Sequence, residues 1–451
     1  MKTKLTKKES MIVASMLFGL FFGAGNLIFP VRMGQLAGSH TISAAAGFCI
    51  TGVGLPLLGV AAMAVSGSEG LFHMSSRAGR WFAYFFTCAL YLTIGPLFAI
   101  PRTATVSFQV GVNPLIPGEH QSLFLFFFSL AFFAVVLFFS LRPSEILTWV
   151  GKVLNPIFLV LLAVLFVTAW FRPMGNMGAA ASAGAYSEGA FFKGFLEGYN
   201  TMDALASLAF GIILIDAVRS LGVKERGRVS VCAVKSGVLS TLLMAFIYFA
   251  LAVVGAQSAA VTGVSPDGGT ALFEIAKHYF GTGGGIFLGV MITVACIKTA
   301  IGLITALGTT FSQLFPKIFT YNRCAVLFCL ISFVIANAGL NAILTVSLPV
   351  LMFLYPVTIV LIMLCLFGNL FNYDRCIFST TIIFTILSAL LSLAESIQSE
   401  FVSSVPAVNM LVGFYHRMPF SGIGMGWILP SAAGFAAGCI LAFVKCRRKA
   451  G

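Results

Sequence analysis

A single lysine lies near the middle of a long apolar stretch. Within residues 285–310 the only charged side chain is Lys298. A lysine deep in an apolar segment is unfavourable unless it is solvated or paired, and such residues commonly mark ion or proton pathways. We therefore expect its ammonium either to stand in for a bound cation or to exchange a proton. Two alternatives remain open: the side chain reaches a polar vestibule, or it pairs with a carboxylate.

Glycine and asparagine cluster in the first apolar stretch. Gly19, Gly23 and Gly25 are followed directly by Asn26 and then by Pro30, a composition that makes a poor continuous helix. We expect an unwound segment here, whose exposed N–H and C=O groups could hold a carboxylate and an ammonium. Close helix packing through the pair of glycines four residues apart is the alternative.

A weaker signal of the same kind occurs in the sixth apolar stretch, at Ser207-Leu208-Ala209-Phe210-Gly211. We expect a second interruption at this point. Two interruptions near the same depth would bring polar backbone groups together halfway across an apolar layer.

Two carboxylates share that sixth stretch. Thirteen helical residues separate Asp203 from Asp216, which is about 20 Å and too far for a shared catalytic site. Asp216 precedes Arg219 by three residues, so we expect a pair on the helix surface. Asp203 could belong to an outer gate or cap its helix. Arg102 could pair with it or anchor its own helix at an interface.

The amino-acid composition indicates whether the protein is surrounded by water or by lipid. The chain has 451 residues, of which 59% are hydrophobic and only 9% charged. Soluble domains carry about 25% charged residues, so a soluble enzyme or a disordered scaffold is excluded. The protein is expected to be an all-α integral membrane protein, because helices satisfy their own backbone hydrogen bonds in lipid.

Apolar length predicts twelve transmembrane helices, with boundaries uncertain by a few residues. The predicted spans are 10–33, 41–65, 81–102, 122–141, 152–171, 200–220, 236–256, 285–310, 324–340, 342–367, 376–395 and 425–444.

Basic residues predict the orientation. Most of the 27 Lys and Arg residues fall on one side when the spans alternate from the N-terminus. Positive charge collects in cytoplasmic loops, so both termini are expected in the cytoplasm, and the first span is expected to be retained rather than cleaved as a signal peptide. The basic patches indicate topology and not a nucleic-acid partner.

The spans group into two blocks of five. Because five is odd, the second block must run in the opposite direction through the membrane, as in inverted-repeat transporters. The expected organisation is a cytoplasmic tail at 1–9, a first repeat at 10–171, an extracellular loop at 172–199, a second repeat at 200–367, two further helices within 376–444, and a cytoplasmic tail at 445–451.

Three long motifs resemble the bacterial branched-chain amino acid:cation symporters, the LIVCS family of the amino acid–polyamine–organocation superfamily. They are LFFGAGNLIFP (20–30), GPLFAIPRTATVSFQVGV (95–112) and EGYNTMDALASLAFG (197–211). The resemblance implies a LeuT-like fold of five plus five helices in a bacterial inner membrane. It also implies uptake of leucine, isoleucine and valine, coupled to Na⁺ or H⁺. Because an apolar pocket discriminates weakly between side chains that differ by a methylene, methionine is a further candidate. An exchanger or a proton-coupled carrier in which Lys298 replaces the bound Na⁺ is the alternative.

The resemblance also assigns substrate-binding roles. The unwound first helix would hold the substrate carboxylate, carbonyls of the sixth helix would hold its ammonium, and Phe210 would line the side-chain pocket. The residues that match are Gly23, Ala24, Gly25 and Asn26 in the first helix, and Ser207, Leu208, Ala209, Phe210 and Gly211 in the sixth.

A cation site is implied in the same way. Its ligands would be carbonyls at Gly19 and Phe22, with Ala295 and Thr299 from the eighth helix. The sequence departs from the superfamily pattern at Lys298, which stands where a first hydroxyl would be. No cofactor is expected apart from Na⁺ as a possible coupling ion, and no obligate protein partner is implied.

Other function classes lack their motifs. The sequence contains no H-E-x-x-H, no G-x-S-x-G within a span and no G-x-x-x-x-G-K-[ST] loop, which argues against an intramembrane protease and an ATP-driven pump. The sequence also lacks a repeat of the kind that forms ion-selectivity filters, which argues against an ion channel.

Overall fold

The computed structural model describes residues 2, 4–178, 181–397 and 406–450, and within these every regular element is a helix. Small parts of the expected N-terminal tail, the loop 172–199, the stretch between the last two helices and the C-terminal tail therefore lie outside the described residues. Among these described residues, ten helical segments are long and apolar enough to cross a membrane, and Tyr321–Ala336 is a shorter apolar helix. The chain is accordingly a multi-pass membrane protein.

The helices of the first half follow the first five predicted spans. π-helical turns at Ile50–Gly54 and Thr93–Leu97 lie inside the second and third spans, and a third π-helical segment, Leu147–Leu154, leads into the fifth. They are α1 (Lys7–Phe21), α2 (Gly25–Ala37), α3 (Thr41–Cys49), α4 (Leu55–Val65), α5 (Leu71–Ser76), α6 (Arg80–Leu92), α7 (Ala99–Gly111), α8 (Gln121–Ser140) and α9 (Asn155–Phe171).

The second half continues the pattern, with two short helices, α10 and α13, preceding α11 and α14. The elements are α10 (Tyr186–Glu197), α11 (Asp203–Ser220), α12 (Arg226–Thr262), α13 (Gly268–Phe280), α14 (Gly284–Leu314), α15 (Tyr321–Ala336), α16 (Leu340–Leu366), α17 (Arg375–Ser396), α19 (Pro406–His416) and α20 (Ile428–Ala450).

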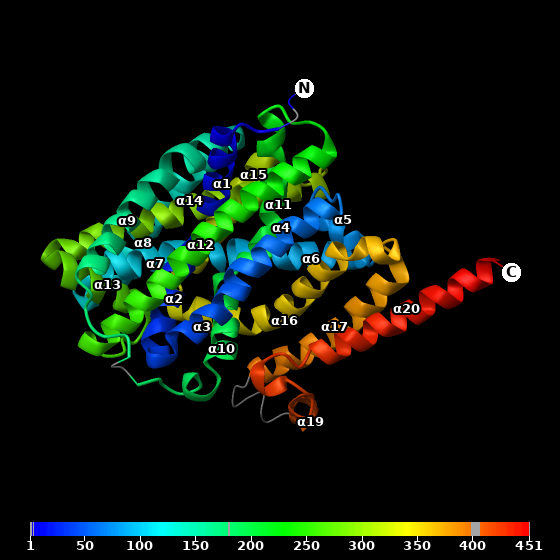
Figure 1. Cartoon of the computed structure of the whole chain (residues 1–451). Helices are drawn as coiled ribbons and strands as arrows, with labels where there is room; N and C mark the ends of the chain where they lie inside the picture. Colours follow the sequence, from blue (N-terminus) through cyan, green and yellow to red (C-terminus); the bar gives the residue numbers. More distant parts are fainter. Residues whose placement is uncertain (1, 3, 179–180, 398–405, 451) are drawn as a thin grey trace.

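The first predicted span is interrupted, as expected. α1 ends at Phe21, Phe22 has extended backbone angles, and α2 begins at Gly25. Glycine tolerates such a break because it has no Cβ to restrict the backbone. The two halves lie at opposite ends of the molecule, with α1 beside the N-terminus and α2 beyond the break (Figure 1).

The predicted interruption at Ser207–Gly211 is wrong, because α11 is helical without a gap from Asp203 to Ser220. One glycine among leucine, alanine, phenylalanine and isoleucine does not break a helix that packing supports on all sides. The break comes earlier, at Gly198–Met202, where Met202 has the left-handed angles φ 61° and ψ 13°. Such a conformation costs a non-glycine residue about 1–2 kcal/mol, so the surrounding packing must impose it.

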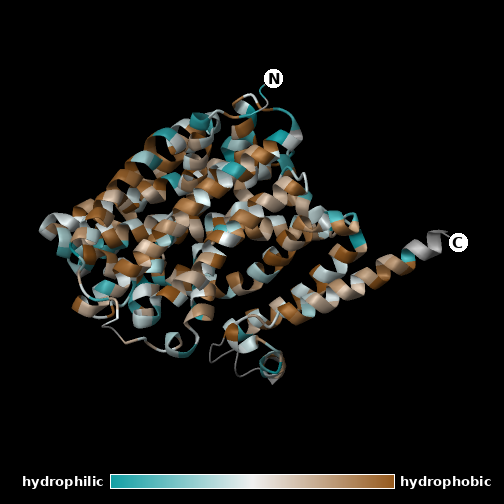
Figure 2. Ribbon diagram, viewed as in Figure 1, coloured by the Kyte–Doolittle hydropathy of each residue, from teal (hydrophilic) through white to brown (hydrophobic). Residues whose placement is uncertain are grey.

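α17, α19 and α20 lie at one side of the helical body (Figure 1), where α17 packs on both α16 and α20. Hydrophobic positions run along the outward faces of the long helices (Figure 2), and large side chains such as Leu242, Phe246 and Val334 are exposed there. This surface suits a hydrocarbon solvent.

Backbone contact fixes α2 against α12. A Cβ added at Gly34 would lie 2.0 Å from the Ala252 carbonyl oxygen, and one at Gly255 would lie 2.2 Å from that of Val31. Such close approach between membrane helices requires small residues.

We predict that Gly34→Ala lowers the stability of the protein. Inserting a methyl group into a tightly packed contact costs about 1–3 kcal/mol, so the midpoint of thermal unfolding in mild detergent should fall. Gly227→Ala is the matched control, because nothing lies within 4 Å of a Cβ at that position. An equal change in both variants would contradict the packing argument.

Candidate functional site

A small cavity lies where the two helix interruptions meet. It measures about 30 Å³, which is room for a water molecule or two. Its walls come from both breaks, from the end of α1, from the π-helical turn Thr93–Leu97, and from the helices α7, α11 and α14. The lining residues are Leu20, Phe21, Gly23, Ala24, Gly25, Asn26, Ile94, Ala99, Arg102, Thr103, Thr201, Met202, Asp203, Ala206, Phe210, Thr299 and Leu303. We call this the central cavity.

Helix ends give the central cavity its polarity. α2 begins at Gly25 and α11 begins at Asp203, and both residues line the cavity. The first N–H groups of a helix have no partner within the helix, and the helix dipole is positive at this end. Two such ends therefore favour an anionic group, while the carbonyls that end α1 and precede Met202 favour a cationic one.

A buried hydrogen-bond network joins the two breaks. Asn26 Nδ2 donates to Asp203 Oδ2 over 2.7 Å and also contacts the Tyr248 hydroxyl. Tyr248 donates to the same carboxylate oxygen at 2.7 Å. The Asn26 Oδ1 atom in turn accepts the N–H of Gly23 at 3.0 Å. One asparagine thus satisfies a backbone group freed by the first break and fixes a carboxylate at the second.

The sequence analysis left two roles open for Asp203, in an outer gate or as a helix cap. The structure places it in the wall of the central cavity. The side chain is 1% exposed and belongs to the cavity wall. A buried carboxylate requires hydrogen-bond donors, and here they come from α2 and α12 rather than from its own helix.

Arg102 is the second buried charge on the central cavity, with 5% of the residue exposed. Its Nη1 atom donates to the Asn200 carbonyl at 2.8 Å, and its guanidinium lies 5.4 Å from the centre of the Phe29 ring. A Cβ on Gly25 would lie 3.0 Å from Nη2. Arg102 thus contacts both breaks. It forms no direct ion pair with Asp203, although both line the cavity.

The structure brings five of the nine predicted substrate residues to the central cavity: Gly23, Ala24, Gly25, Asn26 and Phe210. The other four, Ser207, Leu208, Ala209 and Gly211, do not line it. The Ser207 hydroxyl donates to the Ala204 carbonyl, and the Ala209 carbonyl accepts the Tyr91 hydroxyl. Because α11 is unbroken here, these carbonyls stay within the helix, and Thr201 and Met202 take the expected position instead.

The predicted cation ligands are partly assembled. Thr299 Oγ1 donates to the Gly19 carbonyl at 3.3 Å, and a Cβ on Gly23 would lie 3.1 Å from the same hydroxyl. Phe22 sits at the end of α1 and Ala295 is fully buried on α14. Carbonyl and hydroxyl oxygens are suitable ligands for a hard cation, so Na⁺ remains a chemically reasonable ligand of this region.

Lys298 is fully buried beside these residues. Its Nζ atom donates to Asn155 Oδ1 at 3.0 Å. The same atom lies 4.1, 5.1 and 5.8 Å from the ring centres of Phe158, Phe18 and Phe22. The hydrogen-bond acceptor is an amide oxygen rather than a carboxylate, and aromatic faces supply the remaining stabilisation of a cation. The sequence analysis left two alternatives for Lys298, a polar vestibule or a carboxylate partner, and its surroundings match neither of them.

Some residues of the site were not anticipated. Tyr248 lies in an apolar run, where nothing distinguishes it from a packing tyrosine. Asn155 carried a usable signal, because an amide inside a membrane span is a candidate functional residue. It donates to Ser15 Oγ at 2.9 Å, and Ser15 donates to the Gly151 carbonyl at 2.8 Å.

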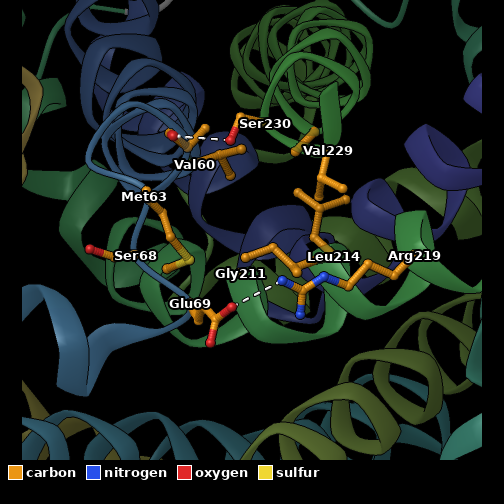
Figure 3. Close-up of a pocket in the computed structure, with 13 residues that line it drawn as sticks. Val60, Met63, Ser68, Glu69, Gly211, Leu214, Arg219, Val229 and Ser230 are labelled. Atoms are coloured by element: carbon orange, nitrogen blue, oxygen red, sulfur yellow. Dashed lines mark hydrogen bonds and ion pairs between the residues drawn. The ribbon is translucent and has the colours of Figure 1, made fainter. Parts of the chain in front are cut away.

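A second cavity lies between the ends of α4 and α11 and the start of α12 (Figure 3). At its edge Arg219 Nη2 donates to Glu69 Oε1 at 3.0 Å (Figure 3). The expected pair of Arg219 with Asp216 is therefore not the ion pair that the structure forms. The Gly211 that was assigned to the substrate lines this second cavity.

The chain matches the model of the branched-chain amino acid transport protein family over residues 6–445. A branched-chain amino acid permease, BrnQ, of Lactobacillus delbrueckii subsp. lactis is 47% identical over 99% of this chain and 100% of its own. BrnQ of Bacillus subtilis is 40% identical over 99% and 100%. The branched-chain amino acid transport system 2 carrier protein of Pseudomonas aeruginosa is 39% identical over 95% and 94%.

Solved structures with similar folds are much more distant in sequence. Mhp1, a nucleobase-cation-symport-1 family transporter with bromovinylhydantoin bound, aligns with a TM-score of 0.57 and 13% identity over 98% of this chain and 93% of its own. MhsT in complex with L-phenylalanine aligns with a TM-score of 0.53 and 14% identity over 97% and 100%. These similarities establish a LeuT-like fold. The family match and the similar permeases show that the chain belongs to the branched-chain amino acid transport protein family.

Proposed function

We propose that this protein is a secondary transporter, and not an enzyme, that imports leucine, isoleucine, valine and methionine across a bacterial inner membrane with both termini in the cytoplasm. The observation that carries this proposal is the central cavity. It places a buried carboxylate, a buried guanidinium and two helix N-termini around one point inside an apolar body. The names of the relatives support the substrate class.

A zwitterion fits the polar half of the central cavity. Its carboxylate would bind the N–H groups at the start of α2, near Gly25, with Arg102 beside them. Its ammonium would bind Asp203 and the carbonyls that precede Met202. Charge-assisted hydrogen bonds of this kind are stronger than neutral ones, so the two charged ends would fix the orientation of the substrate.

The apolar half would hold the side chain. Leu20, Ile94, Phe210 and Leu303 line it. An apolar pocket discriminates between side chains that differ by one methylene by only about 1–3 kcal/mol, which suits a carrier with several aliphatic substrates. The cavity must expand to accept any of them, because about 30 Å³ is smaller than a leucine side chain requires.

Lys298 favours proton coupling as the driving mechanism. A protonated Lys298 supplies positive charge beside Asn155 and the rings of Phe18 and Phe22, next to Thr299, which bonds to the Gly19 carbonyl. Release of that proton would remove the charge and loosen the contact between α1 and α14. Exchange of amino acids without net ion movement is the second candidate, in which the ammonium stays fixed.

Transport itself is tested by counterflow. Proteoliposomes loaded with unlabelled leucine, isoleucine or valine should each accumulate labelled leucine, with saturation and without ATP. Varying Na⁺ and pH independently then reports the coupling ion. Uptake that needed ATP, or that rose without limit with concentration, would contradict a secondary carrier.

We predict that Asp203→Asn weakens transport by at least about tenfold in the KM for leucine, because a charged hydrogen bond contributes about 1.5–3 kcal/mol. Asp216→Asn is the matched control: it makes the same change at the other end of α11, away from the central cavity. Leucine uptake should be measured in proteoliposomes with equal amounts of each variant. Equal kinetics in the two variants would show that Asp203 does not bind the substrate.

We predict that Lys298→Thr changes the coupling. The substitution restores the hydroxyl that the superfamily pattern has at this position. Uptake by the variant should lose its dependence on an imposed pH gradient and gain dependence on Na⁺. Lys277→Gln, in the exposed outer helix α13, is the control for loss of a lysine. If Lys298→Thr leaves both dependences unchanged, the surrogate-cation hypothesis fails.

A further inference from the structure

A basic groove opens where α1 and α12 begin. Its volume is about 530 Å³, far larger than the central cavity. α1 and the start of α12 lie at the end of the molecule that carries the N-terminus (Figure 1), and their residues line the groove. Its lining residues are Lys4, Leu5, Lys7, Ser10, Met11, Arg228, Val231, Cys232, Lys235 and Leu239.

The charges of this groove all have one sign. Lys4, Lys7, Arg228 and Lys235 line it, and none of the described lining residues is acidic. The acidic residues that lie near lining residues in the sequence are paired with basic ones: Glu9 pairs with Lys2 at 2.6 Å, and Glu225 pairs with Arg228 at 2.6 Å. The groove therefore attracts an anion.

Local structure holds the N-terminal lysines in place. Thr6 and Glu9 form a capping box, in which the Glu9 N–H donates to the Thr6 hydroxyl and the Thr6 N–H donates to the Glu9 carboxylate. These hydrogen bonds and the ion pair with Lys2 lower the pKa of Glu9 to about 2, so the carboxylate stays charged at neutral pH. The backbone that carries Lys4 and Lys7 is thus fixed against α1.

An apolar strip continues from the groove along α12. Val231, Leu239, Leu242 and Phe246 are 54%, 46%, 64% and 67% exposed, and they recur at the three- and four-residue spacing of one helix face together with Lys235. A ligand of this groove therefore meets positive charge at the end of the helix and hydrocarbon along its side. That combination matches an anionic phospholipid, whose phosphate lies above its acyl chains.

We propose that the basic groove binds one anionic phospholipid of the leaflet that faces the N-terminal tail. Its phosphate contacts Lys4, Lys7 and Lys235, and its acyl chains lie on the exposed strip of α12. The positive ends of α1 and α12 add to the attraction. Because α1 leads to the first interruption, the lipid stabilises the half-helix that ends at the central cavity.

Purified protein in nanodiscs tests this site. The discs contain phosphatidylcholine alone or mixed with phosphatidylglycerol, and both thermal unfolding and lipid retention in native mass spectrometry are measured. Phosphatidylglycerol should raise the unfolding midpoint of the unaltered protein, and one copy should remain bound. The triple variant Lys4→Gln, Lys7→Gln, Lys235→Gln should bind it about a hundredfold more weakly, at about 1 kcal/mol for each charge.

The control removes basic residues elsewhere on the same side, with Lys317→Gln and Arg323→Gln, and should keep the stabilisation and the bound lipid. An equal loss in control and triple variants would show a general charge effect and overturn the proposal. Equal protection by inorganic phosphate alone would show that the anion need not be a lipid, which also overturns it. If the triple variant does not fold, the single variant Lys235→Gln measured by lipid retention decides the same question.

Discussion

Hydrogen bonding by Asn26 is the interaction on which the rest of the site depends. A helix broken inside an apolar body exposes backbone groups that lipid cannot satisfy. The Asn26 side chain accepts the N–H of Gly23 and donates to Asp203, so it satisfies the first break while holding the second in register. Tyr248 and Arg102 add contacts from α12 and α7. The breaks are therefore held by side chains from several helices, and this fixes where polar ligand groups can bind.

The two buried charge systems share one short segment of backbone. The Gly23 N–H donates to Asn26 Oδ1, and a Cβ on Gly23 would lie 3.1 Å from the Thr299 hydroxyl; all three residues line the central cavity. Thr299 follows Lys298 directly and bonds to the Gly19 carbonyl. A shift of the first break on substrate binding must therefore displace groups beside the lysine. Contact of this kind is the physical requirement for coupling a substrate to an ion, since each ligand must change the state that the other binds.

The fold followed from the sequence because apolar length is a strong signal and lipid permits few alternatives. The first break followed from local composition, since Gly23, Gly25 and Asn26 weaken a helix by themselves. The second break did not, because Met202 adopts left-handed angles that no methionine prefers and that only tertiary packing imposes. Likewise, the environment of Lys298 depends on Asn155, which lies 143 residues away in the chain, and no local pattern joins the two.

A weak ion pair would have to break for the protein to open at the end that carries the N-terminus. Glu69 and Arg219 form the ion pair at the edge of the second cavity, and their side chains are 64% and 40% exposed. An exposed pair of this kind contributes at most about 1 kcal/mol, so it cannot lock that end of the molecule. Other contacts at this cavity are the close approach of Gly211 to Met63 and the hydrogen bond that Ser230 Oγ donates to the Ala64 carbonyl at 3.1 Å. Apolar packing has no directional bonds to break, and a carrier that alternates between two states benefits from an end that separates without leaving unpaired charges.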